Sequence, residues 1–289
     1  MAGGPRAGLA YACITHIPLT LQFPAWVTPL YVGQAQDEGR LNLRDLAPDW
    51  EPHHPLLGGS AGAFAVRRWL MRDHPEATRV GLCQYRKFAS RRRIGNSSTA
   101  ASFKTMDVVS MAQMTPERLE QAMNPGTEPF LVSRLFPMRH KRYLGQYAEV
   151  HRAQDLLHFT AEAVSLGVLA GAEAAAFLDE GEFIPGGLEV GVYPVDFWLP
   201  ASGAVEAVVR ECIQRHPVAP EGYQRRAWAF CAERLGSYLL LRHFRGPGRR
   251  RAWVEVLQRR MPGHWSRRFA GRLNLINEEG QADYVAGGT

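Results

Sequence analysis

Short apolar runs alternate along the chain with stretches in which the apolar residues have helical spacing. The runs over residues 9–15, 26–32 and 79–85 predict buried strands, and residues 61–72, capped by Ser60, predict a helix between the last two. Further along, Thr115-Pro116-Glu117 has the residues typical of a helix start. Alternation of this kind predicts an α/β layered domain.

The second half of the chain continues the alternation. Residues 144–167 predict one long helix, and residues 188–199 are rich in β-branched and aromatic residues and predict a strand. Two helices are predicted after that strand, over residues 203–215 and 222–244. Short strands are also predicted over residues 107–111 and 129–136.

Composition narrows the class of protein. The 289 residues are 46% hydrophobic and 21% charged, which excludes a chain that is disordered throughout or collagen-like. The four cysteines are far apart without a CxxC pair, which argues against a structural zinc site and fits free thiols in a reducing cytoplasm. No signal peptide or membrane span is predicted, since the longest apolar stretch, 161–178, contains two glutamates.

The net charge of +6 is unevenly distributed. Residues 1–241 are neutral, and residues 242–272 carry ten arginines against one glutamate. We therefore expect one domain over residues 1–245 and a basic, helical C-terminal extension over 246–289. The extension fits peripheral contact with anionic lipid at the inner face of a membrane, a solvated helix or dimer contact, or, less well, nucleic-acid binding.

A cationic cluster follows the predicted strand over 79–85. Gly81-Leu82-Cys83-Gln84-Tyr85-Arg86-Lys87-Phe88 leads into Arg91-Arg92-Arg93 with no acidic residue. Ligands of α/β sheets bind beyond the carboxyl ends of strands, and arginine offers paired donors to phosphate. The segment predicts a phosphate or diphosphate site, and a solvated basic loop is the equally weighted alternative.

A second candidate lies in the predicted long helix. Tyr147, His151 and Asp155 are spaced by four residues, which places them on one helical face. Asp155 could orient the imidazole and raise its pKa, so that His151 donates a proton or contacts phosphate. A structural hydrogen-bonded trio, or a histidine at the surface, is the alternative interpretation.

Two carboxylates are candidate acids, bases or sugar ligands. Asp196 lies in the predicted apolar strand, where a carboxylate needs a partner or a shifted pKa, and an exposed turn is the equally weighted alternative. Glu233 stands two helical turns after Arg226, and a structural ion pair between them is the alternative to a catalytic role. The chain has no GxGxxG, P-loop, GxSxG or HExxH motif and no clear Asp-x-Asp, so no metal ligands are predicted and metal dependence stays open. His53-His54 is expected at the surface.

Taken in order, these segments resemble a bacterial family of glycosyltransferases from capsular and surface polysaccharide loci, a domain of unknown function with a Gly-Leu-x-His-Tyr-Arg-Arg motif. Residues 81–88 match that motif, and Gln146, Tyr147, His151, Asp155 and Leu156 match a Gln-Tyr-x3-His-x3-Asp-Leu motif. Residues 196–200 echo an Asn-Met-Phe-Ile-Met segment. Arg226 and Glu233-Arg234-Leu235 echo an Arg-x-x-Gly-Tyr-x-x-Glu-Arg-Leu motif. The resemblance covers residues 9–244.

The resemblance implies a GT-A-like, Rossmann-like fold and transfer of a sugar from a nucleotide-diphosphate donor to a glycan or lipid-linked acceptor. The expected donor and diphosphate ligands are Thr15, His16, Gln84, Tyr85, Arg86, Lys87 and Arg226. Asp196, His151 and Glu233 are the expected catalytic residues, with Tyr147 and Asp155 behind them.

Three positions depart from the family pattern: Gln84 replaces a histidine, Lys87 an arginine and Asp196 an asparagine. Such changes are also compatible with a catalytically silent protein that binds glycans or nucleotide sugars.

Overall fold

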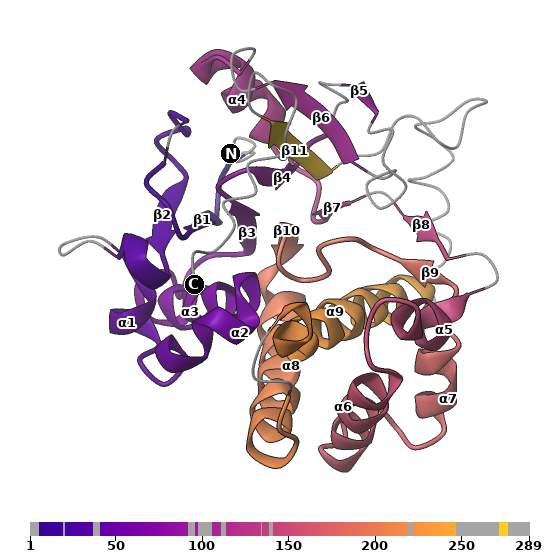
Figure 1. The fold of residues 1–289 in the computed structure, drawn as a ribbon. Coiled ribbons are helices and arrows are strands. Elements are labelled where there is room, and N and C mark those ends of the chain that lie inside the picture. The colour runs from indigo at the N-terminus through magenta and orange to yellow at the C-terminus, as the bar shows by residue number, and fades with distance from the viewer. Residues whose placement is uncertain are drawn as a thin grey trace, which may run out of the picture.

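The structure, a computed structural model, describes residues 6–19, 21–36, 41–91, 96–97, 106–110, 114–133, 135–138, 141–218, 222–246 and 272–276. In these residues a mixed β-sheet is covered by helices on both faces (Figure 1). The predicted α/β class, with a mixed sheet flanked by helices, is confirmed.

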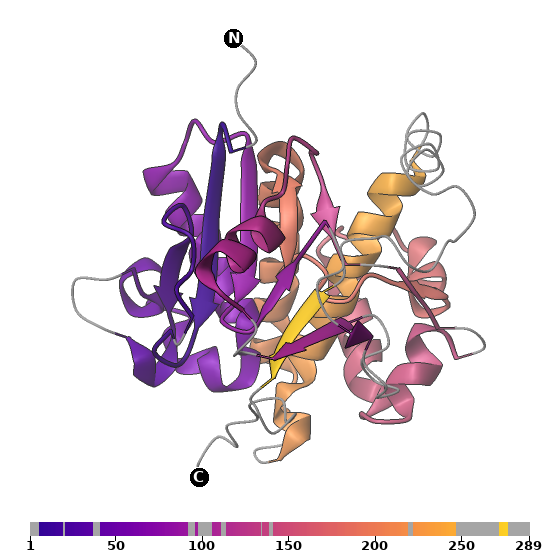
Figure 2. The ribbon, with the colours of Figure 1, turned by 90° about the horizontal axis from the view of Figure 1, so that it is seen from above.

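β1 (Leu9–Thr15) is an interior strand of the sheet and pairs in parallel with β2 (Thr28–Tyr31) and β3 (Arg79–Gln84). β10 (Gly191–Pro194) runs antiparallel to β3, and Figure 2 shows these strands side by side from above. The described strands of the large sheet follow the order β2-β1-β3-β4-β11-β6-β5, with β10 and β7 beside β3. The other strands are β4 (Lys87–Ala89), β5 (Asn96–Ser97), β6 (Met106–Ser110), β7 (Leu131–Val132) and β11 (Arg272–Ile276), and β8 (Phe136–Pro137) pairs with β9 (Glu182–Phe183) apart from them.

Helices α3, α8 and α9 lie on one side of the sheet, and α4 lies on the other (Figure 1). In the described residues no helix is both long and apolar enough to cross a bilayer. The helices are α1 (Leu43–Leu46), α2 (His54–Leu57), α3 (Gly59–Asp73), α4 (Pro116–Met123), α5 (Arg142–Ala148), α6 (Ala153–Ser165), α7 (Glu173–Leu178), α8 (Val195–Arg215) and α9 (Ala227–Arg245).

Alternate residues of β1 face the two cores. Ala10, Ala12 and Ile14 pack in the larger core with α3, α8 and α9, whereas Tyr11 and Cys13 pack in the smaller core beneath α4. Because β1 is buried on both faces, its residues 9–14 form an apolar run, as expected for an interior strand. The sheet edge at the carboxyl end of β1 is thereby held rigidly from both sides.

Three local predictions are wrong. The helix expected over 144–167 is broken into α5 and α6 by residues 149–152. The strand expected over 188–199 spans only Gly191–Pro194, and α8 begins directly after it at Val195. Ser60 was predicted to cap α3 but lies inside it, and the N-cap residue is Gly58.

The C-terminal segment contributes a strand to the sheet. β11 lies between β4 and β6, pairing antiparallel with the first and in parallel with the second. Residues 272–276 therefore extend the sheet, where a separate helical extension was expected. Residues 247–271 and 277–289 lie outside the described residues, so lipid or nucleic-acid contact and a cytoplasmic location stay predictions.

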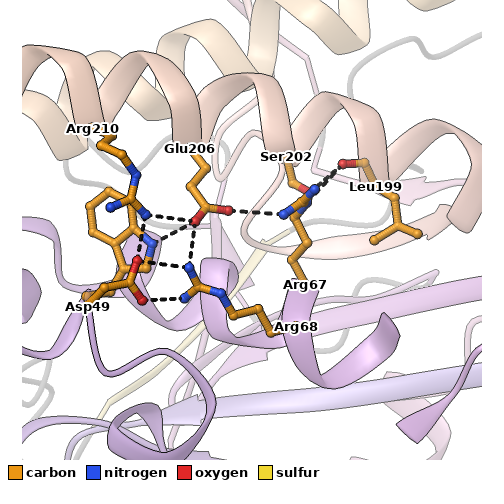
Figure 3. Close-up of polar contacts among 8 residues, drawn as sticks. Asp49, Arg67, Arg68, Leu199, Ser202, Glu206 and Arg210 are labelled. Carbon is orange, nitrogen blue, oxygen red and sulfur yellow. Dashed lines mark hydrogen bonds and ion pairs between the residues drawn. The ribbon is translucent and has the colours of Figure 1, made fainter. Parts of the chain in front are cut away.

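A buried carboxylate ties α3 to α8 (Figure 3). Glu206, only 6% exposed, accepts hydrogen bonds from the indole of Trp50 at 2.7 Å and from Arg68 at 3.2 Å. Its other oxygen accepts from Arg67 at 3.4 Å, and Arg210 adds a contact from within α8 at 3.4 Å.

Asp49 completes this ion network from the segment before α2. It accepts hydrogen bonds from Arg68 at 2.9 Å and from Arg210 at 2.6 Å. Burial alone would raise the pKa of Asp49, but hydrogen bonds from Arg210 and Arg68 outweigh it and lower that pKa. The network therefore joins three separate segments of the chain, the one that carries Asp49, α3 and α8.

We expect Glu206→Gln to lower the free energy of unfolding by about 2–3 kcal/mol, because three arginines then lose a charged partner. The partial exposure of these arginines keeps the loss below that of a fully buried ion pair. Glu211→Gln is the matched control on the same helix, since Glu211 pairs with Arg215 at the surface, and its cost is expected within about 0.5 kcal/mol. Urea unfolding measures both, and equal midpoints would contradict a special role for Glu206.

Candidate functional site

The candidate site begins where β1 and β3 end. Tyr85 and Arg86 form the two-residue turn between β3 and β4, with Gln84 and Lys87 paired across it. The amide of Tyr85 donates to the carbonyl of Ile14 at 3.1 Å, which fixes this turn against the end of β1. The predicted strand followed by a cationic segment is therefore confirmed as strand β3 and this turn.

Thr15 and His16 lie at the same edge. The buried Thr15 hydroxyl donates to the carbonyl of Ile17 at 2.5 Å and so shapes the bend that follows β1. The exposed His16 ring stands edge-on to Tyr85 with 5.1 Å between ring centres. Four of the expected donor ligands, Thr15, His16, Tyr85 and Arg86, thus come from adjacent strand ends.

A glycine pair brings α3 close to this edge. Gly58 has φ +53°, and a Cβ atom there would lie 2.7 Å from Nη2 of Arg226. A Cβ on Gly59 would lie 2.6 Å from Nε2 of Gln84 and 2.8 Å from Oε2 of Glu189. Only glycine permits both the turn and the close approach of these three polar side chains to the start of α3.

Glu189 is the carboxylate that the structure brings to this edge. Its Oε1 accepts a hydrogen bond from the Ser60 hydroxyl at 2.5 Å. Glu189 precedes β10, and the loop before it is held because Gly186 donates its amide to Glu233 at 2.6 Å. Glu233 therefore supports the loop that carries Glu189.

Two histidines lie within the positive field of Arg226. A Cβ on Gly33 would lie 2.9 Å from the His54 ring, which shows how closely that ring packs on the β2 end of the sheet. Burial, then His16 and then Arg226 lower the pKa of His54 to about 4. Burial, then Arg86 and Arg226 also lower the pKa of His16. His54, expected at the surface, is instead a half-buried neutral member of the site.

Asp196 is placed far from this cluster. It is exposed in the first turn of α8, directly after β10. Pro194 pairs with Arg79, the first residue of β3, so Asp196 lies at the opposite edge of the sheet from Gln84. A six-residue strand separates the two edges by roughly 17 Å. The expectation that Asp196 sits within an apolar strand is wrong.

Arg91 also lies away from the turn. β4 runs back along β3, and Arg91 reaches Glu128 at 3.9 Å and packs closely against Gly126. Gly126 accepts a hydrogen bond from Arg79, so Arg91 belongs to the opposite edge as well. Arg92 and Arg93 lie outside the described residues.

His151 occupies the break between α5 and α6, so it does not share a helical face with Asp155. Its Nδ1 faces Oε1 of Gln224 at 3.3 Å. Burial, and then Arg234, lower its pKa, contrary to the expected rise. Asp155 approaches Arg152 at 4.0 Å, and burial raises its own pKa.

Tyr147 is fully buried behind His151, with 4.6 Å between the ring centres. Its hydroxyl donates to the carbonyl of Ala227 at 3.5 Å, and the guanidinium of Arg234 lies 4.7 Å from its ring centre. Tyr147 therefore anchors α5 to α9, whereas the polar partners of His151 and Asp155 are Gln224 and Arg152 and not each other.

Arg226 connects the two groups of residues. It ends a short turn, Tyr223–Arg226, that precedes α9, and its guanidinium lies 5.6 Å from the Phe230 ring, which packs on His151. The predicted helical pairing of Arg226 with Glu233 is replaced by contacts to Gly58 on one side and Phe230 on the other. Among the described residues no group of three His, Cys, Asp or Glu side chains could hold a metal ion.

A solved structure with the same arrangement of elements is the apo structure of WbbM, a bifunctional glycosyltransferase. The TM-score is 0.65 at 14% sequence identity, over 93% of this chain and 45% of WbbM. The chain thus spans less than half the length of that protein, and the likeness shows a glycosyltransferase-like fold. No family model and no curated protein sequence matches the chain.

The lowered pKa of His54 predicts a loss of stability in acid. The unfolded chain binds this proton near pH 6.5 and the folded chain near pH 4, so the free energy of unfolding falls as pH drops through this window. We expect His54→Gln to flatten this dependence between pH 7 and 4.5. Urea midpoints across this range test it, with His53→Gln as the neighbouring control. An unchanged slope in His54→Gln would contradict the prediction.

Proposed function

We propose that the chain is a glycosyltransferase that moves a sugar from a nucleoside-diphosphate sugar to a glycan or glycoconjugate acceptor, in surface polysaccharide synthesis. The observation that carries the proposal is the gathering of Arg86, Arg226, His16 and His54 at the carboxyl edge of β1 and β3, where Arg226 lies against Gly58 and the charges of both arginines reach His16. This edge is where α/β sheets bind their ligands.

The two arginines supply the positive charge that a departing diphosphate needs. Negative charge grows on the diphosphate as the bond to the sugar breaks, and fixed cations stabilise it without reorganisation. Arg86 sits on a two-residue turn, and Arg226 is packed between Gly58 and Phe230, so both are held in place. Lys87, beside Arg86, adds a further cation. The nucleotide base of the donor would lie next to Thr15 and His16, at the end of β1.

The histidines contribute in their neutral form. Because burial, and after it neighbouring positive charge that includes Arg226, lowers the pKa of His16 and His54, their rings offer one donor and one acceptor at neutral pH. The negative charge of an incoming diphosphate opposes the positive charge of the arginines, so donor binding should raise the pKa values of His16 and His54. The arginines thus make the site positive before the donor binds, and the histidines take up protons when the donor binds.

Glu189 takes the role of sugar ligand in this proposal. Its Oε1 is bound by Ser60, and Oε2 lies beside Gly59 and Gln84. A carboxylate at such a place accepts hydrogen bonds from hydroxyl groups of the transferred sugar. Glu233 acts on Glu189 through the loop at Gly186.

A catalytically silent protein that binds nucleotide sugars is the second candidate. The observation that favours it is Gln84, which stands where the resembled family has histidine and cannot donate a proton of tunable pKa. Hydrolysis of a donor by the purified protein would exclude this candidate.

Nucleoside diphosphates should raise the thermal midpoint of the protein, and Arg226→Ala should weaken that binding about 10- to 100-fold. One lost charge-assisted hydrogen bond to phosphate accounts for this range. The adjacent exposed Arg225→Ala is the control and should bind like the wild type. Thermal shift titrations with UDP, GDP and dTDP measure it, with the monophosphate CMP as a comparison. No shift with any nucleotide at millimolar concentration would overturn the proposed donor site.

Transfer itself should depend on Arg86. Once a donor class is known, we expect Arg86→Ala to lower the rate of donor hydrolysis or transfer by about 100-fold, since its charge acts on the leaving diphosphate. Turnover by Arg86→Ala at the wild-type rate would show that the diphosphate lies elsewhere. Arg44→Ala, which changes an exposed arginine on α1, controls for the loss of net charge.

A further inference from the structure

A row of aromatic rings runs from the core to the surface beside Arg226. The rings of His151 and Phe230 are stacked with 4.3 Å between centres, and Tyr223 lies 4.8 Å from Phe230 and 5.5 Å from His151. The inner end is the buried Tyr147, and the outer end is Tyr223, which is 57% exposed. We call these four rings the aromatic shelf: Tyr147, His151, Phe230 and Tyr223.

Gln224 fixes the hydrogen-bonding character of His151. Its Nε2 donates to the carbonyl of Val150 at 2.8 Å, and a carbonyl can only accept. Its Oε1 therefore faces Nδ1 of His151, so that Nδ1 carries the ring proton. Nε2 of the neutral ring is then left as an acceptor, ready for a hydroxyl hydrogen.

The shelf adjoins the proposed donor site through Arg226. The same guanidinium packs against Gly58 at the start of α3 and lies 5.6 Å from the Phe230 ring. A ligand on the shelf would therefore lie next to the diphosphate that Arg226 is proposed to bind. Val150, whose carbonyl accepts a hydrogen bond from Gln224, the residue after Tyr223, is also exposed.

We propose that the aromatic shelf binds a sugar residue of the acceptor, with the C–H face of the sugar on Tyr223 and a hydroxyl donating to Nε2 of His151. This inference rests on the proposed function, since it takes the chain to have an acceptor. A sugar ring combines an apolar C–H face with a polar rim, which suits exposed aromatic rings next to an imidazole acceptor. Exposed apolar surface of this kind next to polar groups is typical of a binding site.

Saturation-transfer NMR with a panel of α- and β-linked hexose disaccharides tests the shelf without knowledge of the donor. We expect the wild type and Tyr223→Phe to transfer saturation to the sugar C–H protons. With Tyr223→Ala this saturation transfer should be about three- to tenfold weaker, the range for a lost ring contact. His151→Phe keeps the stacking and removes Nε2, and it should weaken the effect as well. Met71→Ala, which removes an exposed apolar side chain on α3, should leave it unchanged.

The same four variants are titrated with the nucleoside diphosphate that binds the wild type best. Unchanged nucleotide binding in Tyr223→Ala, together with lost disaccharide saturation, supports the acceptor role. Loss of nucleotide binding in Tyr223→Ala would show that the shelf holds the base and would overturn the proposal. Equal disaccharide saturation in the wild type and Tyr223→Ala, or none in the wild type, would also overturn it. Failure of every nucleotide to bind the wild type contradicts the proposed function, whereas the disaccharide measurement still reports on the shelf.

Discussion

The arrangement of the candidate site depends on how α3 is held. Its first residues carry the Gly58-Gly59 turn and Ser60, and these must stay within contact distance of Arg226, Gln84 and Glu189. The ion network around Glu206 fixes the far half of the same helix to α8, while the core residues along its length pack on β1. A rigid helix carries this constraint from the network to its first turn. A small displacement there would separate the groups that make the site.

Sequence patterns were sufficient where local chemistry decides the structure. β1 has the predicted bounds, β3 differs by one residue, and the Thr115 side chain caps α4 as its residue types indicate. The strand followed by Arg86 pointed to the sheet edge where the carboxyl ends of β1 and β3 coincide in a parallel pair, and the candidate site proposed above is built there. Strong local signals therefore located both the fold class and the side of the sheet on which polar groups gather.

Tertiary packing decided the rest. Residues 195–199 have strand-like composition, yet they begin a helix, because Trp198 is buried and bonds to the carbonyl of Leu188 from helical geometry. That error made Asp196 the expected carboxylate of the site. Glu189, which lies beside Gly59 and Gln84, is seven positions earlier in the chain and precedes β10. The four-residue spacing of Tyr147, His151 and Asp155 likewise suggested that they share one helical face. Instead Gln224, 73 residues from His151 in the chain, determines which nitrogen of the imidazole carries the proton. No pattern within a short window could reveal either pairing.

β11 has a consequence for the order in which the protein is made. Among the described residues, β4, which carries the chain away from the Tyr85-Arg86 turn, has its outer edge paired by residues 272–276. On the ribosome this strand edge stays open until those residues, far along the chain, have been translated. An open edge can pair with other chains, so nascent protein passes through an aggregation-prone interval that ends with β11 insertion. A ribosome that stalls within the arginine-rich stretch before residue 272 would prolong that interval.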